Sequence, residues 1–327
     1  MLYHYIIVAA ATTTDLGGNL RTFSIPCFGA AALAAWLFAA PVAAAEPVRV
    51  VASIKPVHSL VAMVLKGITE PYLIVKGAGS PHGHAMRPSD AKSLAGADAV
   101  FWVGPELETF LTKPLQTLPA SARVVALMND NQDEHSHGKQ EEHEKEHSHG
   151  HDHGGADPHI WLSPGTGVEM LEHIAKVMTE VIPAQAKRIA SNRDRAIQQL
   201  IDVDAEVRRL VAPMQNDYLV VLHEAYGHFT EHYGLQDFIA LSVTPEHKPT
   251  PGNVRDVRQK ITEFGVRCVF AEPQFPDTFV RVLIEGTSAR PGVIDPLGAQ
   301  LIQGPNLYPQ LLRLMGFAIR GCYEETS

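Results

Sequence analysis

The sequence predicts an α/β protein in which two zones of alternating strands and helices are separated by one long helix. Three observations carry this prediction. Short apolar runs alternate with helical stretches from Val48 to Pro183, an uninterrupted amphipathic pattern runs from Pro183 to Pro213, and the alternation returns after Pro213. Strands that alternate with helices indicate parallel sheets covered by helices.

The first zone contains segments of both kinds. The runs VRVVAS, YLIVKG and AVFWVG are short and apolar, as buried strands are. The stretches VHSLVAMVLKG and PSDAKSLAG are longer and have the apolar spacing of helices. This zone therefore predicts the first parallel sheet and the helices that pack on it.

The segment between Pro183 and Pro213 predicts one long helix. Its apolar residues recur at three- and four-residue steps, with charged and amide side chains between them and no internal glycine or proline. Such spacing places the apolar side chains on one face of a helix of roughly seven turns. The helix either packs within a single domain or connects two domains. Its position between two α/β zones supports a connection between domains at least as well as packing within one domain.

The last zone repeats the first in kind. The runs LVVLHEA, RCVFAEPQF and PGVIDPLG predict strands that end near His223, Glu272 and Asp295, respectively. Ligands of open parallel sheets bind at the carboxyl ends of the strands. These three side chains are therefore candidates for a binding site.

The N-terminal segment has the pattern of an export signal. Residues 28–45 are apolar, follow Arg21, and end in small residues before Glu46. A membrane anchor is the alternative, but Pro41 and the alanine-rich end shorten the apolar span below the roughly 20 residues that cross a bilayer. We therefore expect cleavage after Ala45.

Cleavage would remove Cys27 and leave Cys268 and Cys322 as the remaining cysteines. In an oxidising compartment, an even pair predicts one disulfide, which would tie the end of the chain to its last domain. Two buried free thiols are the alternative interpretation.

An insertion from Asn129 to Gly155 has seven histidines and no aliphatic residue. Without apolar area to bury, it should be a mobile exposed loop, and its imidazoles and carboxylates should bind zinc, nickel or copper weakly. A solvated charge run, the alternative, explains the acidic residues but not the histidines. The auxiliary metal-binding residues predicted here are His135, His137, His143, His147, His149, His151 and His153.

The net charge of −9 is uneven along the chain. Residues 130–153 hold eight acidic residues and two lysines, a net charge of −6, so the rest of the chain carries −9 − (−6) = −3. There is no basic patch of the kind that binds nucleic acid and no second apolar span. The composition therefore excludes nucleic acid as a partner.

The stretch HEAYGHF is close to a zinc-protease motif but fails its spacing. In H-E-x-x-H, two histidines four residues apart face one metal ion and the glutamate is the general base. The residue four after His223 is Gly227, and the next histidine is His228. His228 and His232 lie one turn apart, which fits one half-buried face of a helix.

Five motifs, in chain order, resemble those of the zinc branch of the metal-binding solute receptors of ABC transporters, the ZnuA type. They are P-H-x-x-x-x-R-P-S-D, D-P-H-I-W-L-S-P, H-E-A-Y-G-H-F, F-A-E-P-Q-F and D-P-L-G, around a histidine-rich insertion. The resemblance runs from Val48 to Cys322. It implies two α/β lobes, each with a mainly parallel sheet flanked by helices, joined by one long rigid helix, with the metal in the cleft between them.

The implied domain organisation follows these boundaries. A signal peptide spans 1–45, an N-terminal lobe spans 46–182 with the mobile loop at 129–155, a linking helix spans 183–213, and a C-terminal lobe spans 214–327. The late cysteine pair of the zinc branch also matches the two cysteines of the mature chain.

The resemblance places the three histidine ligands of the family on His82, His159 and His223. His84 is the rival of His82, but the spacing to the Pro-Ser-Asp turn favours His82. The carboxylate that some relatives use as a fourth ligand falls on Asp295. Some zinc receptors have a glutamate where this chain has Pro81, so the fourth donor stays open between Asp295, a water molecule and a histidine of the insertion.

We therefore expect a monomeric periplasmic receptor that captures zinc, its transported ligand, and presents it to a membrane permease driven by a cytoplasmic ATPase. Imidazole donors suit zinc, whereas manganese favours carboxylate and water oxygens. One alternative is a zinc hydrolase with an open fourth position and Glu224 as the base. Another is a periplasmic metallochaperone or an adhesin with the same fold.

Overall fold

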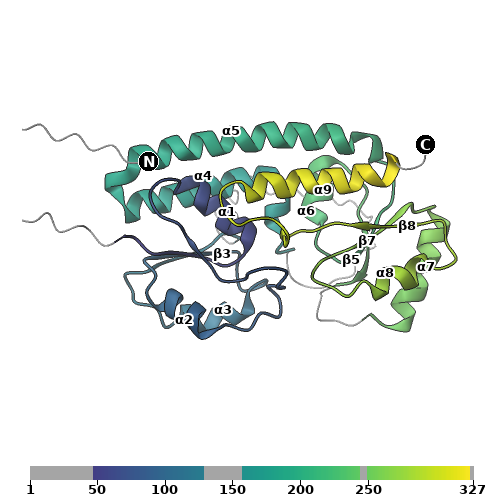
Figure 1. The fold of residues 1–327 in the computed structure, drawn as a ribbon, viewed down its shortest axis with the longest axis horizontal. Helices are drawn as coiled ribbons and strands as arrows, with labels where there is room; N and C mark the ends of the chain where they lie inside the picture. Colours follow the sequence, from purple (N-terminus) through teal and green to yellow (C-terminus); the bar gives the residue numbers. More distant parts are fainter. Residues whose placement is uncertain (1–46, 129–156, 244–248, 325–327) are drawn as a thin grey trace, which may run out of the picture. The chain divides into compact units, whose positions relative to one another are not determined.

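Two parallel four-stranded sheets follow one another along the chain (Figure 1). The computed structural model describes residues 47–128, 157–243 and 249–324. The predicted signal peptide and the histidine-rich insertion lie outside the described residues. Glu46–Ser327 form one compact unit, which contains both sheets.

The first sheet has the strand order β2-β1-β3-β4. Its strands are β1 (Val50–Ala52), β2 (Tyr72–Leu73), β3 (Ala99–Trp102) and β4 (Arg123–Ala126). Every residue of β1 and β3 is buried, because helices cover both faces of a parallel sheet. The helices of this zone before the insertion are α1 (Lys55–Val64), α2 (Pro88–Ala95) and α3 (Thr109–Leu115).

The second sheet has the order β6-β5-β7-β8, with all its pairs parallel. Its strands are β5 (Val220–His223), β6 (Ile239–Ser242), β7 (Cys268–Ala271) and β8 (Arg290–Val293). The helices between them are α6 (Gly227–Tyr233), α7 (Pro251–Glu263) and α8 (Thr278–Ile284). The predicted fold class, with two mainly parallel sheets flanked by helices, is confirmed.

The long helix is α5 (Ala186–Val211), extended at its two ends by 3-10 turns over Pro183–Gln185 and Ala212–Met214. It packs against α1, α4 (Pro164–Val181) and α9 (Leu307–Glu324), and Figure 1 shows it lying along the last two. The buried apolar side chains of α5 belong to a core that also includes residues of both sheets. The predicted division at residues 182 and 213 stays a prediction.

Hydrogen bonds join α1 to the segment that follows β8. The ammonium group of Lys55, at the start of α1, donates to the carbonyl oxygens of Gly298 (2.8 Å), Ala299 (2.7 Å) and Leu301 (3.0 Å). Burial lowers the pKa of Lys55, and the nearby Asp295 partly opposes this shift. The segment after the last strand is thus attached to the first zone of the chain.

The predicted disulfide is confirmed. Cys268 and Cys322 are bonded, with their Cα atoms 6.1 Å apart. The bond joins the first residue of β7 to the last turns of α9.

Glu108 is a buried carboxyl group in the first lobe. Its oxygens accept hydrogen bonds from the Ser53 hydroxyl (2.5 Å) and from the backbone N–H groups of Val103 (3.1 Å) and Gly104 (2.9 Å). Burial raises the pKa of Glu108 to about 7, although these hydrogen bonds act in the opposite direction. A group of this kind makes stability depend on pH.

The folded chain holds the Glu108 proton to about pH 7, whereas the unfolded chain loses it near the ordinary pKa of 4.5. The contribution of Glu108 to stability is therefore complete below pH 4.5 and falls as pH rises to about 7, by at most about 1.4 kcal/mol per pH unit. We expect the free energy of unfolding of the wild type, relative to Glu108→Gln, to be larger at about pH 5 than at about pH 8. Urea titrations of both chains check this, and a constant difference would mean that the carboxyl group stays ionised.

Candidate metal centre

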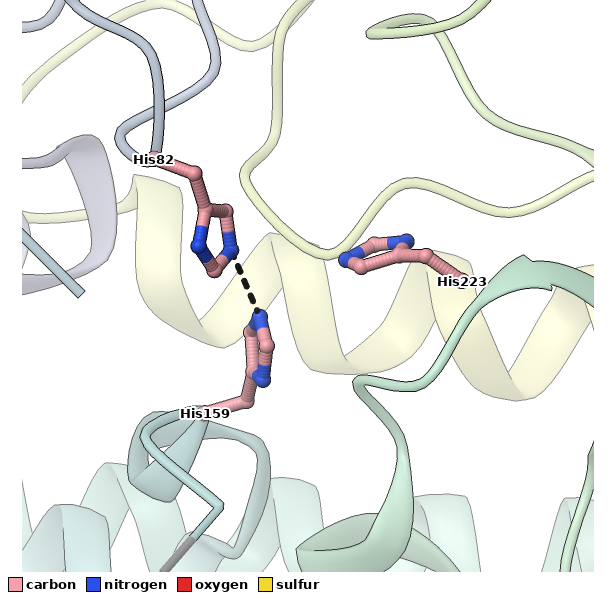
Figure 2. A group of neighbouring side chains, drawn as sticks. All are labelled: His82, His159 and His223. Carbon is pink, nitrogen blue, oxygen red and sulfur yellow. Dashed lines mark hydrogen bonds between the residues drawn. The ribbon is translucent and has the colours of Figure 1, made fainter. Parts of the chain in front are cut away.

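Three histidines from distant parts of the chain meet between the two lobes. Each of His82, His159 and His223 offers a ring nitrogen, and these nitrogens all lie within 4.8 Å of one another. Figure 2 shows the three rings turned toward a common point, with His82 and His159 facing each other. The Nε2 atoms of these two are 3.4 Å apart.

Each histidine is placed by local structure. His223 is the last residue of β5, so its side chain lies at the carboxyl edge of the second sheet, as predicted. His159 comes just before a 3-10 turn over Ile160–Leu162, and its backbone N–H donates to the side chain of Asp157 at 3.0 Å. His82 lies in the segment between β2 and α2.

The spacing of the rings fits zinc. Two nitrogens bound to zinc at about 2.05 Å with a tetrahedral angle are about 3.3 Å apart. The separation of 3.4 Å between the Nε2 atoms of His82 and His159 is already close to this value. Three imidazoles are also a donor set that zinc uses in proteins, so the described residues fit the ion.

Two carboxylates hold the rings from behind. Asp157 Oδ1 lies 2.7 Å from Nδ1 of His159, and Glu272 Oε2 lies 2.7 Å from Nδ1 of His223. The first contact is a hydrogen bond, whereas the orientation of the second is not that of a regular hydrogen bond. Because a carboxylate favours the proton on Nδ1, the Nε2 lone pair of each ring is left for a metal.

Burial keeps the imidazoles of His82 and His159 neutral. Burial lowers the pKa of His82 to about 3, and the nearby His159 and His223 lower it further. Burial also lowers the pKa of His159, against the opposing effect of Asp157. Neutral imidazole is the form that binds a metal, so the two rings are ready to coordinate below the ordinary histidine pKa of about 6.5.

The cavity beside the three histidines has walls from both lobes. Ser80, Pro81 and Trp161 come from the first lobe, and the second lobe supplies Gln274, Phe275, Pro296 and Leu297. The indole N–H of Trp161 donates to the carbonyl oxygen of Pro296 at 2.8 Å, which joins the two walls. The binding position is therefore built by both lobes together.

The structure shows that His82, and not His84, belongs to the group of three histidines. The ring of His84 packs edge-on against Phe110, with centroids 4.9 Å apart, and its Nε2 lies 4.0 Å from Asp90. It is not part of the group of three.

Asp295 also lies outside the group of three histidines. Its carboxylate accepts hydrogen bonds from the backbone N–H groups of Leu297 (3.0 Å), Gly298 (3.0 Å) and Ala299 (2.5 Å). The oxygens of Asp295 are thus engaged with this turn. A role for Asp295 as fourth ligand stays a prediction.

The other residues singled out around His223 have different surroundings. Glu224 is exposed and does not line the cavity. His228 Nε2 lies 2.9 Å from the backbone oxygen of Asp157, and His232 Nε2 lies 2.8 Å from Asp204 on α5. These two histidines tie α6 to neighbouring segments, in agreement with the predicted half-buried helix face.

Sequence reasoning did not identify Asp157 and Gln274. Asp157 belongs to the motif around His159, and an aspartate two residues before a ligand histidine is a usable signal for a carboxylate that holds it. Gln274 belongs to F-A-E-P-Q-F, but nothing in that motif alone shows that its side chain lines the cavity. Glu272 was a candidate at the end of a predicted strand, and its contact with His223 gives it the role of supporting a ligand.

A group of three histidines, two of them buried, lies between two parallel-sheet lobes along which one long helix packs, and this arrangement defines a two-lobed metal-binding receptor. Among the described residues, no helix has the length and apolar character needed to cross a membrane. The chain belongs to the ZnuA family, described as the periplasmic component A of the zinc-uptake complex, whose family model matches residues 50–322.

Individual relatives agree with this assignment. The high-affinity zinc uptake system protein ZnuA of Brucella suis is 39% identical over 312 residues, which cover 86% of this chain and 93% of the relative. The protein of the same name from Paracoccus denitrificans is 36% identical over 303 residues, with the same coverage of 86% and 93%. The structure of the periplasmic zinc binding protein TroA from Treponema pallidum has a TM-score of 0.70 and 19% identity, and the match covers 84% of this chain and 98% of TroA. This structural likeness shows a common fold.

Proposed function

We propose that this chain is a periplasmic receptor that captures zinc between its two lobes and delivers it to the permease of an ABC transporter for import. His82, His159 and His223 bind the ion in this proposal. The observation that carries it is the inward-facing group of three imidazoles, two of them backed by carboxylates, in a chain of the ZnuA family.

The donor set supports zinc as the transported ion. Its three nitrogen donors suit zinc, and no carboxylate belongs to the group among the described residues, whereas manganese prefers oxygen ligands. Copper would also bind three imidazoles, so its exclusion in the cell depends on the supply of each metal.

A receptor is favoured over a hydrolase. The family is one of solute-binding receptors, and the glutamate that a hydrolase would use as base, Glu224, is exposed and away from the cavity. A general base must reach the water that it activates. An activity of this kind would also need Glu224 to move into the site.

Three further parts belong to the proposal. Residues 1–45 direct export, the receptor acts as a monomer, and the histidine-rich insertion 129–155 collects zinc at weak auxiliary sites. The linking helix 183–213 keeps the relative movement of the N-terminal lobe 46–182 and the C-terminal lobe 214–327 small. The bonds of Lys55 to the segment after β8 support this last point.

The experiment that tests the proposal is a zinc titration, in competition with a chelator of known affinity, of the mature chain with residues 130–153 deleted. We expect one tight site to remain and the weak sites to disappear. If no tight site remains, the insertion supplies an essential donor and the assignment of three histidines is wrong.

Asp157→Ala is expected to weaken zinc binding by about 10- to 100-fold. Asp157 holds both the Nδ1 and the backbone N–H of His159, so its loss frees the ring to rotate and to place its proton on Nε2. The competitive titration measures the loss. Asp277→Ala is the matched control, because Asp277 is exposed and forms an ion pair with Arg281, four residues further along the chain. Equal affinities of the two variants would contradict a role for Asp157 in the site.

A further inference from the structure

The cavity has one polar side chain from the second lobe besides His223. Gln274 follows β7 and Glu272, so it also lies beyond the carboxyl edge of the second sheet. The other cavity residues of this lobe are Phe275, Pro296 and Leu297, which are apolar. Gln274 is therefore the group on this wall that offers a hydrogen-bonding side chain.

The orientation of the Gln274 amide follows from its partner. Its Nε2 lies 3.1 Å from Oδ1 of Asp295, and a carboxylate only accepts hydrogen bonds. The NH₂ end of the amide must therefore face Asp295. Asp295 itself is held by the three backbone N–H groups of the turn that follows it. The Oε1 end of Gln274 is thus directed away from Asp295 by a rigid support.

The Oε1 atom of Gln274 is buried and has no hydrogen-bond partner among the described residues. A buried acceptor without a partner costs free energy, so native proteins seldom keep one without a use. A partner that arrives with the bound ion would remove this cost. Three imidazoles leave one position of a tetrahedral zinc ion open, and a water molecule bound there is a strong hydrogen-bond donor.

We propose that Gln274 is the positioning residue of the fourth zinc ligand: its Oε1 accepts a hydrogen bond from the water molecule that completes the coordination, while Asp295 fixes the amide from behind. This inference rests on the proposed function, since it requires zinc on the three histidines. It gives Asp295 a role other than ligand, which agrees with the engagement of its carboxylate by backbone groups and by Gln274.

The first test compares the zinc affinity of the wild type with that of Gln274→Leu, which keeps a similar volume and removes the amide. We expect the affinity of the variant to fall by about 10- to 100-fold, because the water loses its partner while the three imidazoles remain. Gln259→Leu is the matched control, since Gln259 is exposed on α7 and does not line the cavity. An affinity of Gln274→Leu within twofold of the wild type would overturn the proposal.

The second test detects the water itself. The wild type is loaded with cobalt, and its electron paramagnetic resonance spectrum is recorded in water enriched in a magnetic oxygen isotope. We expect line broadening from a coordinated water molecule, and a changed spectrum in Gln274→Leu. An unbroadened wild-type spectrum would mean that a protein group such as Asp295 fills the fourth position. This measurement on the wild type stays decisive even if the variant does not fold.

The proposed function and the proposed role of Gln274 fail in different ways. If the wild type without residues 130–153 binds no zinc tightly, the proposed function is wrong. If it binds zinc tightly and either test gives the contrary result, the receptor stands and only the role of Gln274 is wrong.

Discussion

His159→Ala, in a chain that lacks residues 130–153, is expected to remove the one tight zinc site. His159 supplies one of three nitrogen donors, is buried, and is held by Asp157 at 2.7 Å. Tight zinc sites in proteins have binding free energies of about 10–16 kcal/mol shared among about four donors, so losing one donor should weaken binding by at least about 100-fold. Competitive titration against a chelator of known affinity measures this loss.

His84→Ala is the matched control for this prediction. His84 lies two residues from His82 and packs against Phe110, outside the group of three. Its replacement should leave the zinc affinity unchanged within a few fold. If His84→Ala removes the site while His159→Ala keeps it, the ligand set has to be rebuilt around His84.

Replacing Cys268 and Cys322 together by alanine is expected to lower the free energy of unfolding by about 4 kcal/mol, the loop-closure estimate for a sequence separation of 54 residues. The disulfide ties the first residue of β7 to α9, which packs against α5 and α1. Without it, the unfolded chain gains freedom and the end of α9 loses its attachment to the second sheet. Urea titrations of the oxidised wild type and of the double variant give the difference.

Zinc affinity should stay unchanged in the double cysteine variant. Cys268 begins β7, whereas Glu272, which holds His223, follows the other end of the same strand. The disulfide and the metal therefore occupy opposite edges of the sheet. A reductant should destabilise the wild type and leave the double variant unaffected, which controls for other effects of the reagent. A large loss of zinc affinity in the double variant would contradict this separation.

Much of the fold was predictable because its signals are local. The period of apolar residues predicted the long helix, and Pro183 and Pro213 lie within the short 3-10 turns that extend α5. The apolar run before His223 correctly placed this histidine at the end of a strand. The strands β4 and β6 were not singled out, although they are as long as β5, β7 and β8.

The metal site was harder to predict than the fold, because few of its features have local sequence signals. The assignment of three histidines to one metal depended on the resemblance of five motifs to a family, because the residues come from separate elements. The contacts that hold the site join residues far apart in sequence, such as Glu272 with His223 and Lys55 with the segment after β8. Neither the periodicity nor the composition of the sequence predicts which end of the Gln274 amide faces Asp295.

The two carboxylates behind the histidines also fix the electrical charge of the site. Asp157 and Glu272 place two carboxylates behind His159 and His223, and burial lowers the pKa of His82 and His159, which leaves these two rings uncharged at neutral pH. A zinc ion brings two positive charges, so the loaded site is close to electrically neutral and the empty one is not. Zinc capture then releases no proton from His82 or His159 at neutral pH. A monovalent cation would balance only one of the two carboxylate charges. The site therefore selects a divalent ion by its charge as well as by its preference for imidazole donors.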